Sequence, residues 1–279
     1  MSQYTTPTLT IDAPNGTSYA YRRFGRQGGV PVVFMQHFRG NLDGWDPALV
    51  DDIAAEREVI LFDASGIAGS TGVTPRTFRE FGRDALAFID ALGLDLIDLF
   101  GFSIGGFGAQ EAALLRPHLV RRLILAGTGP QGGRDMHGWN DTIRGHAYRE
   151  AQDAEDAIYL FFTGSDRSRA RGAEFLGRVY TRTEGRDAEV SRAAWEAQAE
   201  AILDWGIPDT SKLARLSGIT APTLVANGDN DIMVPTVNSF LLAGHLPDAR
   251  LVIYPDANHG FLFEFPHEFA SEVNAFLAD

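Results

Sequence analysis

The stretch LDLIDLFGFSIGGFGAQEAALL (residues 94–115) joins an apolar run to a helical pattern, with a single serine at the join. Residues 96–100 predict a strand that is buried on both faces, and residues 108–117 predict a helix. Ser103 lies between them, in the pattern Gly-x-Ser-x-Gly (101–105). This serine is either a nucleophile held at a sharp turn or a small polar residue in a tight loop packed by glycines.

A serine on a sharp strand-to-helix turn is well placed to react. The turn forces the side chain above the sheet edge, and glycines on either side leave room where a side chain would collide. The amide of the next residue, Ile104, begins the helix and is free to donate to an oxyanion. A nucleotide-binding glycine loop is a further alternative, but the Gly-x-Gly-x-x-Gly spacing and the acidic residue about 20 positions later are both missing.

The rest of the chain alternates apolar runs with helical patterns. Residues 9–25 alternate apolar and polar side chains around Asn15-Gly16, which predicts a β-hairpin. Further buried strands are predicted at residues 30–36, 58–63, 121–127, 221–228 and 249–255, and amphipathic helices at 74–94 and 267–278. This order predicts an α/β fold, with a mostly parallel central sheet and helices on both faces.

Residues 131–210 break this alternation. They contain helical patterns, at 154–162 and 191–206, but no convincing strand. We therefore expect a helical cap at 131–210, inserted into a core domain formed by residues 1–130 and 211–279.

Composition narrows the classes of partner and cofactor. The 279 residues carry a formal charge of −13, which argues against nucleic acid and against an anionic membrane surface as partners. The absence of cysteine excludes disulfides, thiol nucleophiles and thiolate metal sites. No pair of histidines has helical zinc-ligand spacing, so we expect neither a metal nor an organic cofactor. The first ten residues lack the features of a signal peptide and no apolar run is long enough for a membrane span, so we expect a soluble, cytoplasmic protein.

A reactive serine needs a general base, and the base needs an acid to orient it. His259 follows the last predicted strand, where a loop side chain can reach across the sheet edge. The acid should lie after the preceding strand, and both Asp229 and Asp231 lie there. Either aspartate is also compatible with a turn-stabilising role, and spacing alone does not choose between them.

With this serine turn and the later acid and histidine loops, the chain resembles the α/β-hydrolase superfamily. It most closely resembles the small serine esterases and the cofactor-free haloperoxidase or perhydrolase-like members. The acid loop of that family commonly reads Gly-x-x-Asp, with a proline four residues later. Gly228, Asp231 and Pro235 fit this frame, so the resemblance favours Asp231 as the acid. It also assigns residues 257–260 to the histidine loop, and therefore His259 as the base.

The chain departs from the family where the first long strand ends. The family usually reads His-Gly-x there, and the amide of x is the second oxyanion donor. Here Gln36, His37 and Phe38 take those three positions, so the resemblance implies that the amides of Phe38 and Ile104 form the oxyanion hole. His37 is either a variant of the scaffold loop or a second polar group that contacts substrate. For Arg39, a solvent-exposed or ion-paired side chain is expected over contact with an acidic substrate group.

These residues predict a serine hydrolase that cleaves carboxylic esters of small, mainly apolar substrates through an acyl-enzyme. Ser103 is the expected nucleophile, with His259 as base and Asp231 as its partner. A serine here argues against haloalkane dehalogenases and epoxide hydrolases, whose counterparts resemble aspartate nucleophiles. A lactonase, a C–C bond hydrolase, a perhydrolase, a cofactor-independent dioxygenase and a lyase remain open, as does a receptor-like binding protein that retains the triad.

The cap is expected to select the substrate through aromatic side chains. The predicted pocket residues are His37, Phe102, Trp139, Trp205 and Phe261. An apolar pocket of this kind favours short-to-medium or cyclic acyl groups over charged ones.

Overall fold

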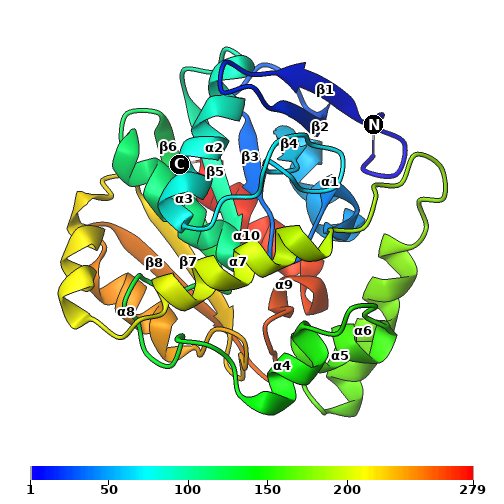
Figure 1. Ribbon diagram of the computed structural model, residues 1–279, viewed down its shortest axis with the longest axis vertical. Helices are drawn as coiled ribbons and strands as arrows, with labels where there is room; N and C mark the ends of the chain where they lie inside the picture. The colour runs from blue at the N-terminus through cyan, green and yellow to red at the C-terminus, as the bar shows by residue number, and fades with distance from the viewer. Residues whose placement is uncertain (1, 279) are drawn as a thin grey trace.

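An eight-stranded sheet forms the centre of the protein, of which the computed structural model describes residues 2–278 (Figure 1). The strands are β1 (Leu9–Asp12), β2 (Ser18–Gly25), β3 (Val32–Met35), β4 (Glu58–Phe62), β5 (Ile97–Phe102), β6 (Val120–Ala126), β7 (Thr223–Gly228) and β8 (Ala249–Tyr254). Their spatial order is β1-β2-β4-β3-β5-β6-β7-β8. The first two strands form the expected hairpin and pair antiparallel, whereas β4, β3 and β5 to β8 are parallel.

Helices cover both faces of this sheet. One face packs against α1 (Pro47–Glu56) and α10 (Pro266–Ala278), and the other packs against α2 (Phe78–Ala91), α3 (Ile104–Leu115) and α8 (Val237–His245). Successive side chains of a strand point to opposite faces. In β3, accordingly, Val32 and Phe34 join the core on the α1 side while Val33 and Met35 join the core on the α2 side.

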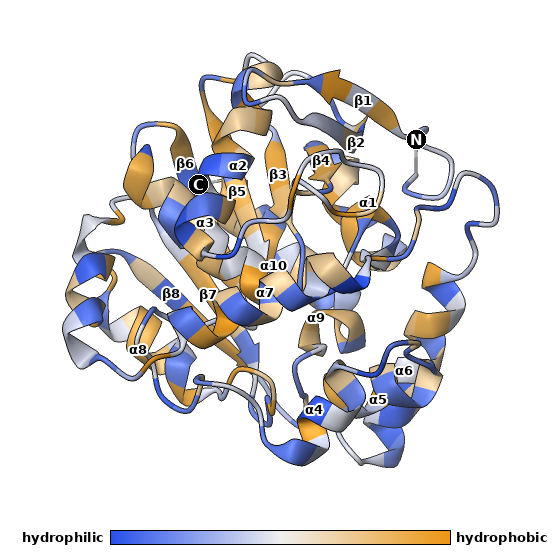
Figure 2. Ribbon diagram, viewed as in Figure 1, coloured by the Kyte–Doolittle hydropathy of each residue, from blue (hydrophilic) through white to orange (hydrophobic). Residues whose placement is uncertain are grey.

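The central strands are apolar along their whole length. Every residue of β3, β4, β5 and β7 is buried, and Figure 2 shows β3, β5 and β7 in the hydrophobic colour. Strands covered on both faces have no solvent side, so they read as continuous apolar runs rather than alternating ones. This is why they could be predicted from the sequence.

Helices fill the segment between β6 and β7. These are α4 (Asp141–Ala147), α5 (Ala154–Phe161), α6 (Asp166–Val179) and α7 (Arg192–Trp205), followed by the 3₁₀ helix η2 (Thr210–Gly218). The side chains of Asn140, Asp153, Ser165 and Ser191 cap the N-termini of α4 to α7 in order. In Figure 1, α4, α5 and α6 form a group at the lower right, and α7 crosses the middle of the view. Within residues 2–278, no helix combines the length and the apolar character needed to cross a membrane.

Loops from the carboxyl ends of parallel strands meet at one edge of the sheet. The loop after β3 carries residues 36–41, and β5 leads directly into Ser103. The loops after β7 and β8 carry Asp231 and His259. This edge is where open parallel sheets place their ligand sites, so it is the candidate site here.

Candidate active site

Ser103 stands at a strained turn between β5 and α3. Its backbone has φ 56° and ψ −121°, a combination that residues other than glycine rarely adopt. Two hydrogen bonds hold the turn: the Ser103 amide donates to the Ala126 carbonyl (2.9 Å), and the Thr128 hydroxyl donates to the Ser103 carbonyl (2.8 Å). Strain of this kind persists only where the surroundings over-determine it, and it clusters at functional sites.

The two glycines of the pattern are required by close contacts. A Cβ atom on Gly105 would lie 2.1 Å from the Met35 carbonyl oxygen, at the end of β3. A Cβ atom on Gly101 would lie 2.6 Å from the Gly105 carbonyl oxygen. Both distances are far below van der Waals contact, so a side chain at either position would push α3 away from the sheet.

His259 and Asp231 form a buried hydrogen-bonded pair. The His259 Nδ1 atom lies 2.8 Å from Asp231 Oδ2, and both side chains are almost completely buried. The other carboxylate oxygen of Asp231 accepts from the amides of Met233 (2.8 Å) and Val234 (2.9 Å), which fixes its orientation. Asp229, the other candidate acid, accepts from the Ala257 amide and the neighbouring Asn230 side chain, as a turn residue does.

Asn258 links the two loops and was not anticipated from the sequence. Its side-chain oxygen accepts from the Ile232 amide (2.9 Å) in the acid loop and from the His259 amide (2.8 Å). Its side-chain nitrogen donates to the Phe162 carbonyl, just after α5 (3.0 Å). The imidazole itself stacks on Phe102, with ring centroids 5.0 Å apart. The only sequence signal for this role was the place of Asn258 next to the predicted histidine.

Ser103 and His259 line the same small cavity, beneath the helical segment. Its volume is about 60 Å³. The lining residues are His37, Phe38, Arg39, Ser103, Gln152, Leu160, Phe161, Met233 and His259. Most of this wall is apolar, and the polar groups gather near the serine and at the side of the cavity next to α4.

The His37 ring lines this cavity in its neutral form. Its Nδ1 atom donates to the Phe38 carbonyl (2.8 Å), because a carbonyl oxygen only accepts. Burial lowers the pKa of His37 to about 4. At neutral pH the remaining ring nitrogen, Nε2, is therefore a hydrogen-bond acceptor.

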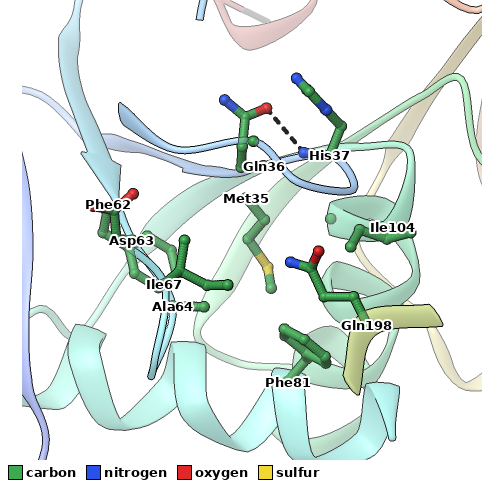
Figure 3. Close-up of a pocket in the computed structure, with 12 residues that line it drawn as sticks. Met35, Gln36, His37, Phe62, Asp63, Ala64, Ile67, Phe81, Ile104 and Gln198 are labelled. Atoms are coloured by element: carbon green, nitrogen blue, oxygen red, sulfur yellow. Dashed lines mark hydrogen bonds between the residues drawn. The ribbon is translucent and has the colours of Figure 1, made fainter. Parts of the chain in front are cut away.

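Gln36 braces the loop after β3, in the position that the family gives to histidine. Its side-chain oxygen accepts from the His37 amide (2.9 Å), as Figure 3 shows. Its side-chain nitrogen donates to the Asn41 carbonyl (2.9 Å). The described residues offer no acceptor for the Phe38 amide. Ile104 begins α3, so its amide has no partner within the helix.

Three predicted pocket residues lie in the core instead. Phe102 is fully buried behind His259, and Trp205 stacks on Phe107 with its indole nitrogen donating to the Gly129 carbonyl. Phe261 is fully buried between Tyr254 and Phe269, packed against α10. An aromatic residue that is close to a site in the sequence can pack in the core or contact a ligand. These three residues pack in the core.

Two other predictions concern residues closer to the site. His37 lines the cavity, as expected of a pocket residue. Trp139 lies one layer behind the wall: its ring packs on Phe38, and its indole nitrogen donates to the Met233 carbonyl (2.9 Å). Phe161, Leu160 and Met233 form the wall itself and were not among the predicted pocket residues.

Sequence comparison agrees with this architecture. A family model described as the alpha/beta hydrolase fold matches residues 30–266. The chain belongs to the α/β-hydrolase family. The predicted fold class, with its mostly parallel sheet between two layers of helices, is thereby confirmed.

Relatives of this α/β-hydrolase are named as hydrolases of several kinds. The 2-hydroxy-6-oxo-6-phenylhexa-2,4-dienoate hydrolase of Burkholderia cepacia is 28% identical and covers 100% of this chain and 99% of its own. Among solved structures, an alpha/beta hydrolase fold protein from Chitinophaga pinensis is 39% identical, covers 99% of both chains and has a TM-score of 0.94. Est816, described as an N-acyl homoserine lactone degrading enzyme, is 27% identical with a TM-score of 0.74, covering 96% of this chain and 100% of its own.

Proposed function

We propose that this α/β-hydrolase is a serine hydrolase that cleaves carboxylic esters through an acyl-enzyme. The observation that carries the proposal is the site geometry: Ser103 and His259 line one cavity, and His259 is hydrogen-bonded through Nδ1 to the buried Asp231. A base oriented by an acid, beside a serine on a strained turn, is the arrangement that activates a serine hydroxyl.

The reaction proceeds in two acyl transfers. Ser103 Oγ attacks the ester carbonyl carbon while His259 Nε2 takes the hydroxyl proton, and Asp231 stabilises the resulting imidazolium. The amides of Phe38 and Ile104 donate to the oxyanion, and removing one such donor typically costs about 10²–10³ in rate. His259 then returns the proton to the departing alkoxide, and a water molecule hydrolyses the acyl-enzyme by the same steps.

The cavity supports small acyl groups. The apolar part of its wall is formed by Phe38, Leu160, Phe161 and Met233, and its volume is about 60 Å³. Esters of short or cyclic acyl groups fit this description better than charged or long-chain esters.

The first test replaces the nucleophile. We expect Ser103→Ala to lower kcat/KM for p-nitrophenyl butyrate by roughly 10³-fold or more, since the residual rate would come from binding and the oxyanion donors alone. Ser217→Ala is the matched control, because Ser217 is exposed on η2 and its hydroxyl donates to the nearby Ala214 carbonyl. A Ser103→Ala variant that hydrolyses the ester as fast as the wild type would refute the assignment.

Lactone hydrolysis is the second candidate, because the same attack opens a cyclic ester. The likeness to Est816, which degrades an N-acyl homoserine lactone, favours including it. A panel of p-nitrophenyl esters, lactones and thioesters, compared by kcat/KM, distinguishes the two candidates. The likeness to a dienoate hydrolase makes C–C bond hydrolysis a further arm of the same panel.

A further inference from the structure

Arg39 directly follows the Phe38 amide and is bonded to the helical segment that covers the site. We propose that Arg39 is a positioning residue that couples closure of this segment to the oxyanion hole, so that the Phe38 amide is in place only when α4 and α7 are docked. The inference rests on the proposed function, since it needs the Phe38 amide to be an oxyanion donor. It predicts that Arg39, although it also lines the cavity, acts on transition-state stabilisation through the position of the Phe38 amide.

The guanidinium group of Arg39 binds the last residue of α4 and the segment that directly follows this helix. It donates to the carbonyls of Ala147 (3.2 Å), Arg149 (2.6 Å) and Glu150 (3.0 Å). The last carbonyls of a helix have no intrahelical donor, and a cation is favourable there. These three bonds therefore tie the loop after β3 to the end of α4.

The Arg39 backbone is tied to a second helix. Its amide donates to the side-chain oxygen of Gln198 (2.9 Å), a buried residue of α7, and its guanidinium lies 5.2 Å from the centre of the Trp195 ring on the same helix. Figure 3 shows the Gln198 side chain reaching from α7 toward Ile104 and the loop that carries Gln36 and His37. Both ends of Arg39 thus hold the same loop against the covering helices.

The turn at Arg39 is strained. Its φ is 61°, which is uncommon for a residue other than glycine, and the Gly40 amide donates to the His37 carbonyl (3.0 Å) across the turn. A strained turn relaxes when the contacts that impose it are lost. The Phe38 amide lies inside this turn, so its direction depends on the bonds that Arg39 makes.

The small size of the cavity favours movement of the covering helices when a substrate binds. A cavity that binds benzene has a volume of about 150 Å³. The cavity beside Ser103 measures about 60 Å³, which is smaller than that, so we expect the covering helices to move when an aryl ester binds. Movement of α4 or α7 breaks the Arg39 contacts, and re-docking restores them together with the position of the Phe38 amide.

The test compares Arg39→Gly, Arg39→Lys and Arg192→Ala with the wild type. Glycine tolerates the left-handed turn and removes the guanidinium, whereas lysine keeps the charge but has no planar fork for three carbonyls. Arg192 is the matched control: it is exposed on α7 and lies 5.9 Å from the same Trp195 ring, but does not reach the loop after β3. The measurements are kcat and KM for p-nitrophenyl acetate and Ki for a short-chain trifluoromethyl ketone, whose hemiketal oxyanion occupies the oxyanion hole.

We expect Arg39→Gly to lower kcat roughly 10- to 100-fold and to weaken ketone binding by a similar factor, while KM changes less, because a misplaced donor costs at most as much as a missing one. Arg39→Lys should show a smaller loss, and Arg192→Ala should match the wild type. If either Arg39 variant keeps wild-type circular dichroism and changes KM alone, or changes neither kcat nor Ki, the coupling is wrong. Ser103→Ala separates the two proposals, because a fully active Ser103→Ala enzyme refutes the proposed function rather than the role of Arg39.

Discussion

At the scale of single residues, contact with the β3 carbonyl oxygen at Met35 governs how closely α3 approaches the sheet. Gly105 lies against that oxygen, and the turn at Ser103 depends on this approach. Gly177 is the opposite case: it lies exposed in α6, and a Cβ atom there would meet nothing within 4 Å. At Gly105 a side chain is excluded by steric contact, whereas at Gly177 only the helix propensity of the residue matters.

Exchanging these glycines for alanine should have opposite effects on the free energy of unfolding. We expect Gly105→Ala to lower it by about 3 kcal/mol or more, since overpacking against backbone is not relieved by a side-chain rotation. Gly177→Ala should raise it by about 0.5–1 kcal/mol, because alanine favours the helix. Urea denaturation measures both, and equal stability of Gly105→Ala and wild type would show that the turn does not depend on this contact.

The predicted triad residues all lie shortly after strands, where the end of a strand fixes the position of the chain. Ser103 and Asp231 follow the buried strands β5 and β7, and His259 follows the more exposed edge strand β8. The apolar runs of these strands are visible in the sequence, and the structure brings Asp231 and His259 into hydrogen-bond contact. Phe261 also follows a strand, yet it faces the core. The direction of a loop side chain depends on packing partners from distant segments, and the sequence pattern does not contain them.

At the scale of elements, a buried carboxyl group connects α6, α9 (Phe261–Glu264) and the loop that carries His259. Glu264 is buried at the end of α9; its carboxylate accepts from the Asn258 amide (3.4 Å) and lies 3.9 Å from the Arg167 guanidinium of α6. Burial raises the pKa of Glu264 to about 7. The native protein therefore holds a proton here that the unfolded chain releases.

This difference gives stability a pH dependence with a definite sign. Between pH 4.5, the ordinary pKa, and about pH 7, the native state binds more protons than the unfolded state, so the free energy of unfolding falls as pH rises. We expect Glu264→Gln to flatten this slope and to be more stable than the wild type at pH 8 by about 1 kcal/mol. Urea midpoints at pH 5 and pH 8 test this, and an unchanged difference between the two pH values in the variant would contradict it.

Helices and strands could be predicted where their pattern of apolar residues differs clearly from that of the flanking sequence. The hairpin, the buried strands and α2, α3 and α10 follow the expected ranges closely. The helices α1 and α8 were not predicted, although α1 begins with a capping aspartate and a proline at its start. The short apolar stripes of these helices stabilise them only by packing against the sheet, because tertiary packing provides most of the stability of short helices.

At the scale of the whole molecule, one sheet edge holds the candidate catalytic residues and one set of helices covers them. The sheet positions Ser103, Asp231 and His259 through strand ends and the loops that follow them. The covering helices contribute the wall of the cavity and the contacts to Arg39. Under the proposed function, we expect the sheet to carry the chemistry and the helices to select and admit the substrate.

The central claim is that Ser103 is a nucleophile activated by His259, and covalent trapping tests it most directly. The enzyme is incubated with a fluorophosphonate, and the adduct is located by intact mass and peptide mapping. The account predicts a single adduct on the peptide that contains Ser103, absent in Ser103→Ala and formed far more slowly in His259→Ala. An enzyme that hydrolyses p-nitrophenyl butyrate while Ser103 stays unlabelled would contradict it.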